Sequence, residues 1–159
     1  MKKFWLAAAM IPLMATSAMA ETDLEREKAA VIAVDVLVST ATTAEAGLST
    51  FAPDVLQDDF FPPQRKGVSE VAKDFDYYMA NYADFKAVIL DMNADVDGNL
   101  AVVYSHQHFL AKGKNGTPDL DAMIRQTDIL HKINGAWKIT YQHLSVPIDI
   151  KTGKAIYKP

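Results

Sequence analysis

No cysteine occurs among the 159 residues. A chain without thiols forms no disulfide framework, holds no thiolate zinc site and has no thiol nucleophile. The chemistry that remains belongs to carboxylates, imidazoles, hydroxyls and guanidinium groups. Any reaction carried out by this chain would have to use those groups.

Basic charge is also scarce. Sixteen Lys and Arg residues stand against 20 Asp and Glu residues, which gives a formal net charge of -4. A protein that binds a phosphate backbone needs a basic surplus, so we expect no nucleic-acid partner. The length and the hydrophobic content of 50% suit one globular domain.

Long apolar runs are missing except near the N-terminus. Lys2 and Lys3 precede an apolar run over residues 4–14, and the small-residue sequence Ala18-Met19-Ala20 follows it. The run is about half the length that spans a bilayer, and this anatomy is typical of a secretory signal peptide. We therefore expect residues 1–20 to be a signal peptide, and residues 21–159 to form a single domain without membrane attachment. Short signals that begin with lysine are common in Gram-negative bacteria, so the predicted location is periplasmic or secreted.

Helical spacing dominates the first half of the mature chain. Thr22 and Glu25 form a capping-box pattern before a helix predicted to end near Thr40. A short second helix is predicted over residues 44–51, closed by Pro53, and Ser69 is predicted to cap a third helix over residues 70–82. The intervening residues 54–67 are interpreted as a loop with at most one short strand, because Pro62-Pro63 cannot lie in a central strand.

The periodicity changes to that of strands in the second half. Four strands are predicted over residues 85–96, 100–111, 119–133 and 136–146. Asp97-Gly98 and Asn134-Gly135 are the dipeptides that type I′ hairpin turns require, because both central residues need a positive φ. The sequence therefore predicts an antiparallel meander packed on the helices in one α+β domain.

One stretch of sequence carries a family resemblance. Residues 125–147 follow the pattern R-x-T-x-x-x-x-K-x-(D/N)-G-x-W-x-I-x-x-x-H-x-S-V-P, and residues 51–55 are similar to the segment that ends the second helix in the same proteins. The chain resembles the SnoaL-like, or nuclear transport factor 2-like, superfamily, which includes ketosteroid isomerases, polyketide cyclases and dehydratases. The resemblance implies a cone-shaped, curved antiparallel sheet packed against about three N-terminal helices, an enclosed cavity, and a homodimer formed through the outer face of the sheet. Fold membership alone does not settle function.

A two-residue turn at Asn134-Gly135 predicts the pairing of the last two strands. Residues directly opposite each other share a face of the sheet. The register pairs Trp137 with Lys132, Ile139 with Leu130, Tyr141 with Asp128, His143 with Gln126 and Ser145 with Ile124. Trp137, Ile139 and Leu130 should face the interior, so Asp128, Tyr141 and His143 are expected in the cavity.

Those polar residues suggest acid–base chemistry. Asp128 or His143 could take a proton while a phenol or imidazole holds a developing oxyanion. The alternative is that Asp128 and His143 only satisfy each other or neighbouring polar groups, as buried polar residues must. Arg125 belongs to the family pattern and falls on the opposite face unless a bulge intervenes, so its side stays open.

A metal site is a further alternative. His106 and His108 lie two apart on one face of a strand, which is acceptable spacing for zinc, and His143 could supply a third ligand. The other interpretation is that these histidines line a polar rim or a partly exposed strand. The family pattern contains no metal-binding motif, and no cofactor is expected.

The sequence therefore favours a domain that binds a small, largely apolar or aromatic ligand. The proposed catalytic residues are Asp128 and His143, and the proposed ligand-binding residues are Tyr78, Tyr104, Arg125, Trp137 and Tyr141. Two alternatives remain open. One is a cofactor-independent isomerase, cyclase or dehydratase that uses a pocket Asp or His as base, and the other is a dimeric interaction module without turnover.

Overall fold

The computed structural model describes residues 13–59 and 63–156, with side chains from Thr22 onward. Residues 1–12, the first part of the predicted signal peptide, lie outside the described residues, so its cleavage stays a prediction. The described helices and strands, in chain order, are α1 Leu13–Thr40, α2 Ala44–Leu48, β1 Phe51–Asp58, β2 Arg65–Lys66, α3 Val68–Asn81, β3 Tyr82–Asp97, β4 Leu100–Gly113, β5 Leu120–Ile133 and β6 Ala136–Ser145.

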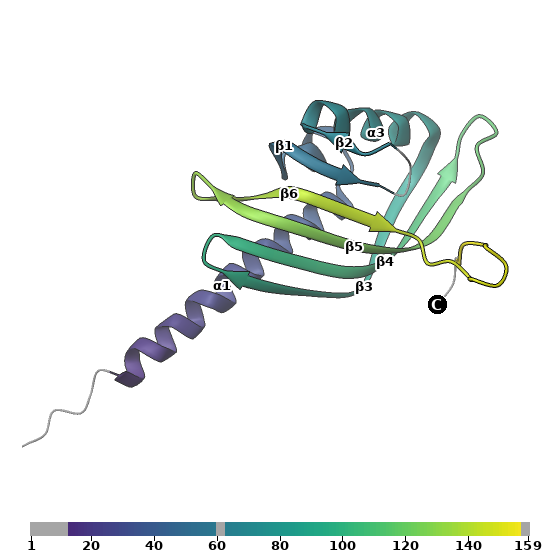
Figure 1. The fold of residues 1–159 in the computed structure, drawn as a ribbon. Helices are drawn as coiled ribbons and strands as arrows, with labels where there is room; N and C mark the ends of the chain where they lie inside the picture. Colours follow the sequence, from purple (N-terminus) through teal and green to yellow (C-terminus); the bar gives the residue numbers. More distant parts are fainter. Residues whose placement is uncertain (1–12, 60–62, 157–159) are drawn as a thin grey trace, which may run out of the picture.

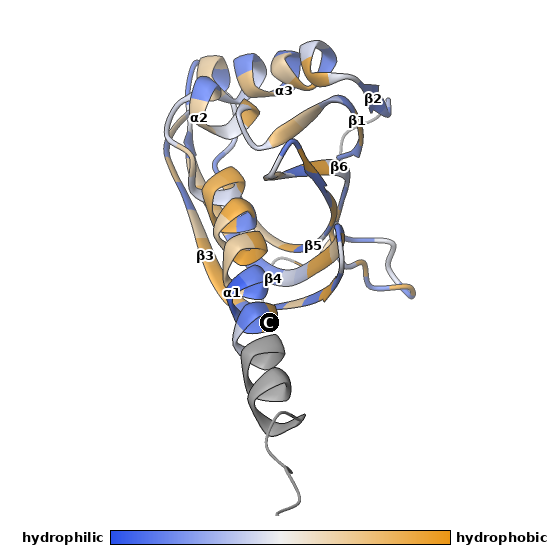
Figure 2. Ribbon diagram, turned by 90° about the vertical axis from the view of Figure 1, so that its left-hand side faces the viewer, coloured by the Kyte–Doolittle hydropathy of each residue, from blue (hydrophilic) through white to orange (hydrophobic). Residues whose placement is uncertain are grey.

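The strands form one sheet in the order β2-β1-β6-β5-β4-β3 (Figure 1). Figure 2 shows the sheet curving from β3 round to β1, with α1 along the concave side and α2 and α3 over the open end. This is the expected α+β cone with three helices. The sheet is mixed rather than purely antiparallel, because β1 runs parallel to β6.

The four long strands occupy nearly the predicted ranges. At the β5–β6 hairpin, Asn134 and Gly135 both have positive φ, 50° and 81°, as a type I′ turn requires. The β3–β4 turn differs from the prediction. Asp97 pairs with Leu100, so the central residues are Gly98 and Asn99, and only Gly98 has a positive φ.

The helical half departs from the sequence prediction in three places. α1 already begins at Leu13, so the capping-box pattern at Thr22 does not start the helix. α3 begins at Val68 after Gly67, with no side-chain cap bond, so Ser69 is not its cap. α2 ends at Leu48, because the chain turns there into β1.

β1 is the long strand that the sequence did not place: it lies partly in residues predicted to end a helix and partly in residues 54–67, where a loop with at most one short strand was expected. Its pairing with β6 is continuous from Leu56 to Asp58, whereas the stretch between Phe51 and Leu56 is irregular. Pro53 lies in that irregular stretch, where its missing N–H removes no ladder bond from a regular strand. A proline that argued for the end of a helix is therefore compatible with a strand.

The main core lies between α1 and the concave face of the sheet. Val31 of α1, Val103 of β4, Leu130 of β5 and Ile139 of β6 are all fully buried there. Trp137 belongs to the same cluster at 7% exposure, in agreement with the predicted interior position. Among the described residues, no helix has the length and hydrophobicity that a membrane crossing requires.

A β-bulge in β6 changes the register beyond this core. Leu130 pairs with Ile139 as expected, but Ile129 pairs with Tyr141, so Thr140 is the extra residue. Asp128 then lies opposite Gln142 rather than Tyr141, and Gln126 opposite Leu144 rather than His143. The predicted pairings from Tyr141 onward, including Ser145 with Ile124, are therefore wrong by one residue. Since side chains alternate along a strand, the shift turns Gln142 and Leu144 inward.

Candidate functional site

A cavity of about 350 Å³ opens between the helices and the concave face of the sheet. Its wall is largely apolar and aromatic, and the side chains that form it come from α1, α3, β3, β4 and β6: Val38, Phe75, Tyr78, Met79, Tyr82, Phe85, Phe109 and Leu144. The buried polar side chains of this wall, which we call the floor, are Ser39, Gln57, Gln126 and Gln142, and less buried polar residues also line the cavity: Thr42, Asp59, Asp74, Asp84 and Lys114. An apolar cavity with a few converging polar groups is the usual form of a small-molecule site.

The floor is a chain of hydrogen-bonded amides. The Nε2 group of Gln57 donates to Oε1 of Gln142 over 2.8 Å, and the two residues face each other across β1 and β6. Gln142 Nε2 in turn donates to Oδ2 of Asp128 over 3.2 Å. The three glutamines are at most 5% exposed, so their amides have fixed partners rather than bulk water.

Two buried carboxyl groups lie directly behind the floor. Gln126 Nε2 donates to Oδ1 of Asp35 and to Oδ2 of Asp128, both over 3.0 Å. Burial raises the pKa of Asp35 to about 7, and burial together with the nearby charge of Asp35 raises the pKa of Asp128 well above its usual range. We infer that the two groups hold at least one proton between them at neutral pH.

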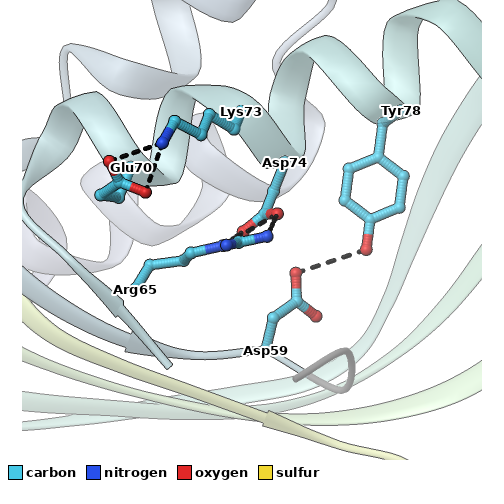
Figure 3. Close-up of polar contacts among 6 residues, drawn as sticks. All are labelled: Asp59, Arg65, Glu70, Lys73, Asp74 and Tyr78. Carbon is cyan, nitrogen blue, oxygen red and sulfur yellow. Dashed lines mark hydrogen bonds and ion pairs between the residues drawn. The ribbon is translucent and has the colours of Figure 1, made fainter. Parts of the chain in front are cut away.

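The rim of the cavity carries a second cluster of polar side chains, shown in Figure 3. Arg65 binds Asp74 with both ends of its guanidinium, through Nε at 2.9 Å and Nη2 at 2.6 Å. The Tyr78 hydroxyl donates to Oδ2 of Asp59 over 3.3 Å. Burial, and then the charge of Asp59, raise the pKa of Tyr78, so the phenol stays protonated and remains a donor.

The predicted site residues fall into different places. Tyr78 lines the cavity, and Asp128 faces the interior but lies behind the floor, fully buried. Trp137 is in the core, where its Nε1 donates to Glu27 over 2.7 Å, and it does not line the cavity. Tyr104 is 43% exposed on the outer face of the sheet.

The bulge in β6 also moves residues that were expected in the cavity. Tyr141 is on the outer face, where its hydroxyl donates to Oδ2 of Asp58 over 2.9 Å. His143 is exposed on that face, and its partner on the neighbouring strand β5, Thr127, lies on the same face. The expected approach of Asp128, Tyr141 and His143 in one pocket is therefore wrong. Arg125 is exposed on the outer face as well, as the unbulged register of β5 suggested.

The histidines of the metal hypothesis do not converge. His106 Nδ1 contacts Asp91 at 2.9 Å, and His108 Nε2 contacts Asp121 at 2.6 Å. His143 lies on β6, which β5 separates from β4. Within residues 13–59 and 63–156, no three His, Asp or Glu side chains come together in a way that could hold a metal ion.

Sequence reasoning missed most of the floor. Asp35 follows Val31 by four residues on α1 and precedes Ser39 by four, so a carboxylate and a hydroxyl interrupt the apolar face that packs on the sheet. That interruption is a signal that could have found Asp35. Gln57 and Gln142 gave no such signal, because the strand β1 and the bulge that place them were not foreseen.

The comparisons with known proteins agree with this architecture. Residues 45–149 match the family described as SnoaL-like domain. The chain belongs to the SnoaL-like domain family. No curated protein sequence matches the chain.

Several solved structures share the SnoaL-like fold. An NTF2-like protein of unknown function from Pseudomonas putida KT2440 superposes with a TM-score of 0.72 and 18% identity, covering 85% of this chain and 98% of the other. A ketosteroid isomerase-like protein from Erwinia carotovora atroseptica gives a TM-score of 0.65 and 19% identity, covering 75% and 95% of the two chains. A candidate dehydratase of the NTF2-like family from Streptomyces avermitilis gives 0.67 and 19%, covering 82% and 99%. At these identities the likeness shows the fold alone.

Proposed function

We propose that the protein binds a small, largely apolar molecule in the cavity, with the polar end of the ligand against the glutamine floor. The observation that carries this proposal is an aromatic-walled cavity of about 350 Å³ with a cluster of buried amides and a hydroxyl in its wall. Such a distribution buries an apolar body and orients it through a few hydrogen bonds. No cofactor is needed for this role.

A neutral fluorescent probe tests cavity binding. N-phenyl-naphthylamine is weakly emissive in water and bright in an apolar site, so titration of the protein should give saturable fluorescence. Ala83 lines the cavity, and Ala83→Trp should fill part of it and weaken probe binding at least about tenfold. Tyr104→Trp on the outer face is the matched control and should bind the probe as the wild type does. Equal binding by Ala83→Trp and the wild type would place the probe elsewhere and refute the proposal.

The second candidate is a cofactor-independent isomerase, cyclase or dehydratase. It is favoured by Asp59 and Tyr78, a carboxylate and a protonated phenol that meet at the cavity wall (Figure 3). In this proposal Asp59 takes a proton from the substrate and Tyr78 stabilises the charge that develops. Asp128 is too deeply covered to touch a ligand, and His143 is on the outer face, so the base moves from the two residues first proposed to Asp59.

Proton exchange distinguishes turnover from binding. β-Tetralone has acidic hydrogens beside its carbonyl, and NMR in heavy water follows their exchange. A catalytic site should accelerate exchange above the buffer rate, and Asp59→Asn should lower that rate by about 10² or more. If β-tetralone at saturating concentration is exchanged by the wild type only at the buffer rate, the cavity binds without catalysing proton transfer.

We also propose that the mature protein is an exported homodimer. The signal-peptide pattern over residues 1–20 supports export. An outer sheet face that the helices leave uncovered, with Tyr104 on it, supports pairing of two copies. Light scattering at micromolar concentration tests the dimer, and the mass of a single chain would refute it.

A further inference from the structure

The buried carboxyl group of Asp128 determines how the floor presents its amides. Its Oδ2 atom accepts from both Gln126 and Gln142, at 3.0 Å and 3.2 Å. An amide can only offer its N–H₂ end to an oxygen that accepts, so Gln142 must turn Nε2 toward Asp128. Its other end, Oε1, therefore points to Gln57. This orientation holds when Asp128 is ionised and when its proton is on Oδ1, the oxygen that has no partner among the described residues.

The same constraint passes to Gln57. Since Gln142 presents Oε1, Gln57 must present Nε2, and the two atoms are 2.8 Å apart. The Oε1 atom of Gln57 is left at the far end of the chain of amides. It is buried and accepts no hydrogen bond from the described residues.

Four buried oxygen atoms behind and in the floor share this lack of a donor in the described part of the chain: Asp35 Oδ2, Gln57 Oε1, Gln107 Oε1 and Asp128 Oδ1. Of these residues, Gln57 alone lines the cavity. A buried acceptor without a donor is costly, and a donor that reaches it gains more than it would at a solvated site. A hydrogen-bond donor on a ligand therefore gains the most free energy when it binds Oε1 of Gln57.

Most of the donors of the floor have partners inside the protein. The amide of Gln126 serves the two carboxyl groups, and that of Gln142 serves Asp128. Ser39 donates to Asp35 and accepts from Gln107. Gln57 and Gln142 each use one of their two amide N–H groups in these contacts, so a ligand that only accepts can bind an N–H but leaves Oε1 of Gln57 without a donor. Charges of both signs also line the cavity, since Asp59, Asp84 and Lys114 belong to its wall and Asp74 is paired with Arg65.

We propose that the ligand is a neutral apolar molecule that carries a hydroxyl or N–H donor, and that Gln57 is the residue that selects for this donor. Molecules of similar size that only accept hydrogen bonds, such as ketones, leave Oε1 of Gln57 unpaired and are disfavoured. The inference rests on the proposed binding function and adds to it the chemical class of the ligand and a specificity-determining residue.

Two bicyclic probes of nearly equal size test the donor requirement. β-Naphthol donates a hydrogen bond, whereas β-tetralone only accepts. In calorimetric titrations the wild type should bind β-naphthol about tenfold or more tightly than β-tetralone. Gln57→Met keeps the length of the side chain and removes the acceptor, so the two affinities should come within about twofold of each other.

Two further variants separate this selection from general damage. Gln142→Met keeps the acceptor of Gln57 but removes the group that fixes its orientation, so the preference for β-naphthol should fall in this variant too. It provides the test if Gln57→Met does not fold. Phe85→Leu trims the apolar wall and should weaken both probes alike, leaving their ratio unchanged.

The failures of the two claims are distinguishable. Equal affinity of the wild type for both probes, or an unchanged preference in Gln57→Met, would overturn the donor requirement while cavity binding stands. Binding of neither probe by the wild type would overturn cavity binding and, with it, the inference.

Discussion

The Asp35 side chain is a carboxyl group placed where water cannot reach it, on the face of α1 that packs against the sheet. Burial raises its pKa from an ordinary 3.8 to about 7. The folded state therefore holds a proton that the unfolded state releases between about pH 4 and pH 7. The contribution of this group to stability is fully present below that interval and is lost as the pH rises through it.

The Asp35→Asn variant should lose this pH dependence. We expect the free energy of unfolding of the wild type to fall between pH 5 and pH 8, by at most about 3 kcal/mol from this group, and the fall to be smaller in Asp35→Asn, in which Asp128 remains. Urea titrations at the two pH values measure it. Asp95→Asn, at an exposed position on β3, should keep the wild-type fall. A wild-type stability that rises over the interval would contradict the assignment.

Trp137 carries a second residue-scale prediction. It is 7% exposed, its Nε1 donates to Glu27, and the Lys132 ammonium lies 5.5 Å from the ring centroid. Trp137→Ala should cost about 3 to 5 kcal/mol of unfolding free energy, measured by urea denaturation. Ile150→Ala, at a position after β6 that is 91% exposed, should change it by less than about 0.5 kcal/mol. Comparable losses in the two variants would contradict the burial of Trp137.

Residue by residue, the sequence allowed correct placement where alternation and turn geometry agree. The Asn134-Gly135 turn fixes Trp137 and Ile139 in the core, and β5 has no bulge beside Asp128, which therefore faces inward as expected. Tyr141 and His143 could not be placed correctly. Thr140 bulges out of β6, and a single extra residue reverses every later side chain without leaving a mark in the hydrophobic pattern.

The contact between α2 and α3 sets one side of the cavity. A Cβ atom on Gly47 of α2 would lie 2.4 Å from Cε1 of Phe75, which is on α3 and lines the cavity. Gly47→Ala should therefore destabilise the protein by about 1 to 3 kcal/mol and displace the ring. Differential scanning calorimetry measures the loss.

The double variant Gly47→Ala with Phe75→Leu provides the control. The smaller side chain relieves the clash, so the double variant should lose less stability than the sum of the two single variants. If the stability losses of the two single variants simply add, a Cβ atom at position 47 does not clash with Phe75.

At the scale of elements, the local half of the fold was accessible from sequence and the non-local half was not. Four strands joined by short loops follow from period-two alternation and glycine-containing turns. β1 pairs with β6 across more than 80 residues of sequence, and it contains Pro53, so neither a local turn nor a clean alternation announced it. The floor residue Gln57 lies on β1, so it was not predicted either.

At the scale of the whole molecule, the predicted cleavage of the N-terminal signal peptide can be checked directly. The exported form should begin at Glu21, because cleavage is expected after the Ala18-Met19-Ala20 sequence. Intact-mass spectrometry of protein from the periplasm or the medium measures the mature end. A chain that still carries residues 1–20 in the membrane fraction would contradict the prediction.

The central claim is that one small molecule occupies the cavity with its polar end on the glutamine floor. Side-chain amide signals in an NMR titration with β-naphthol test it most directly, because Gln57, Gln126 and Gln142 each carry an N–H₂ group at that site. We expect these signals and the methyl signals of Val38 and Leu144 to shift together and to saturate at one equivalent. Shifts confined to outer-face residues such as Tyr104 and His143, with the floor amides unmoved, would contradict the account.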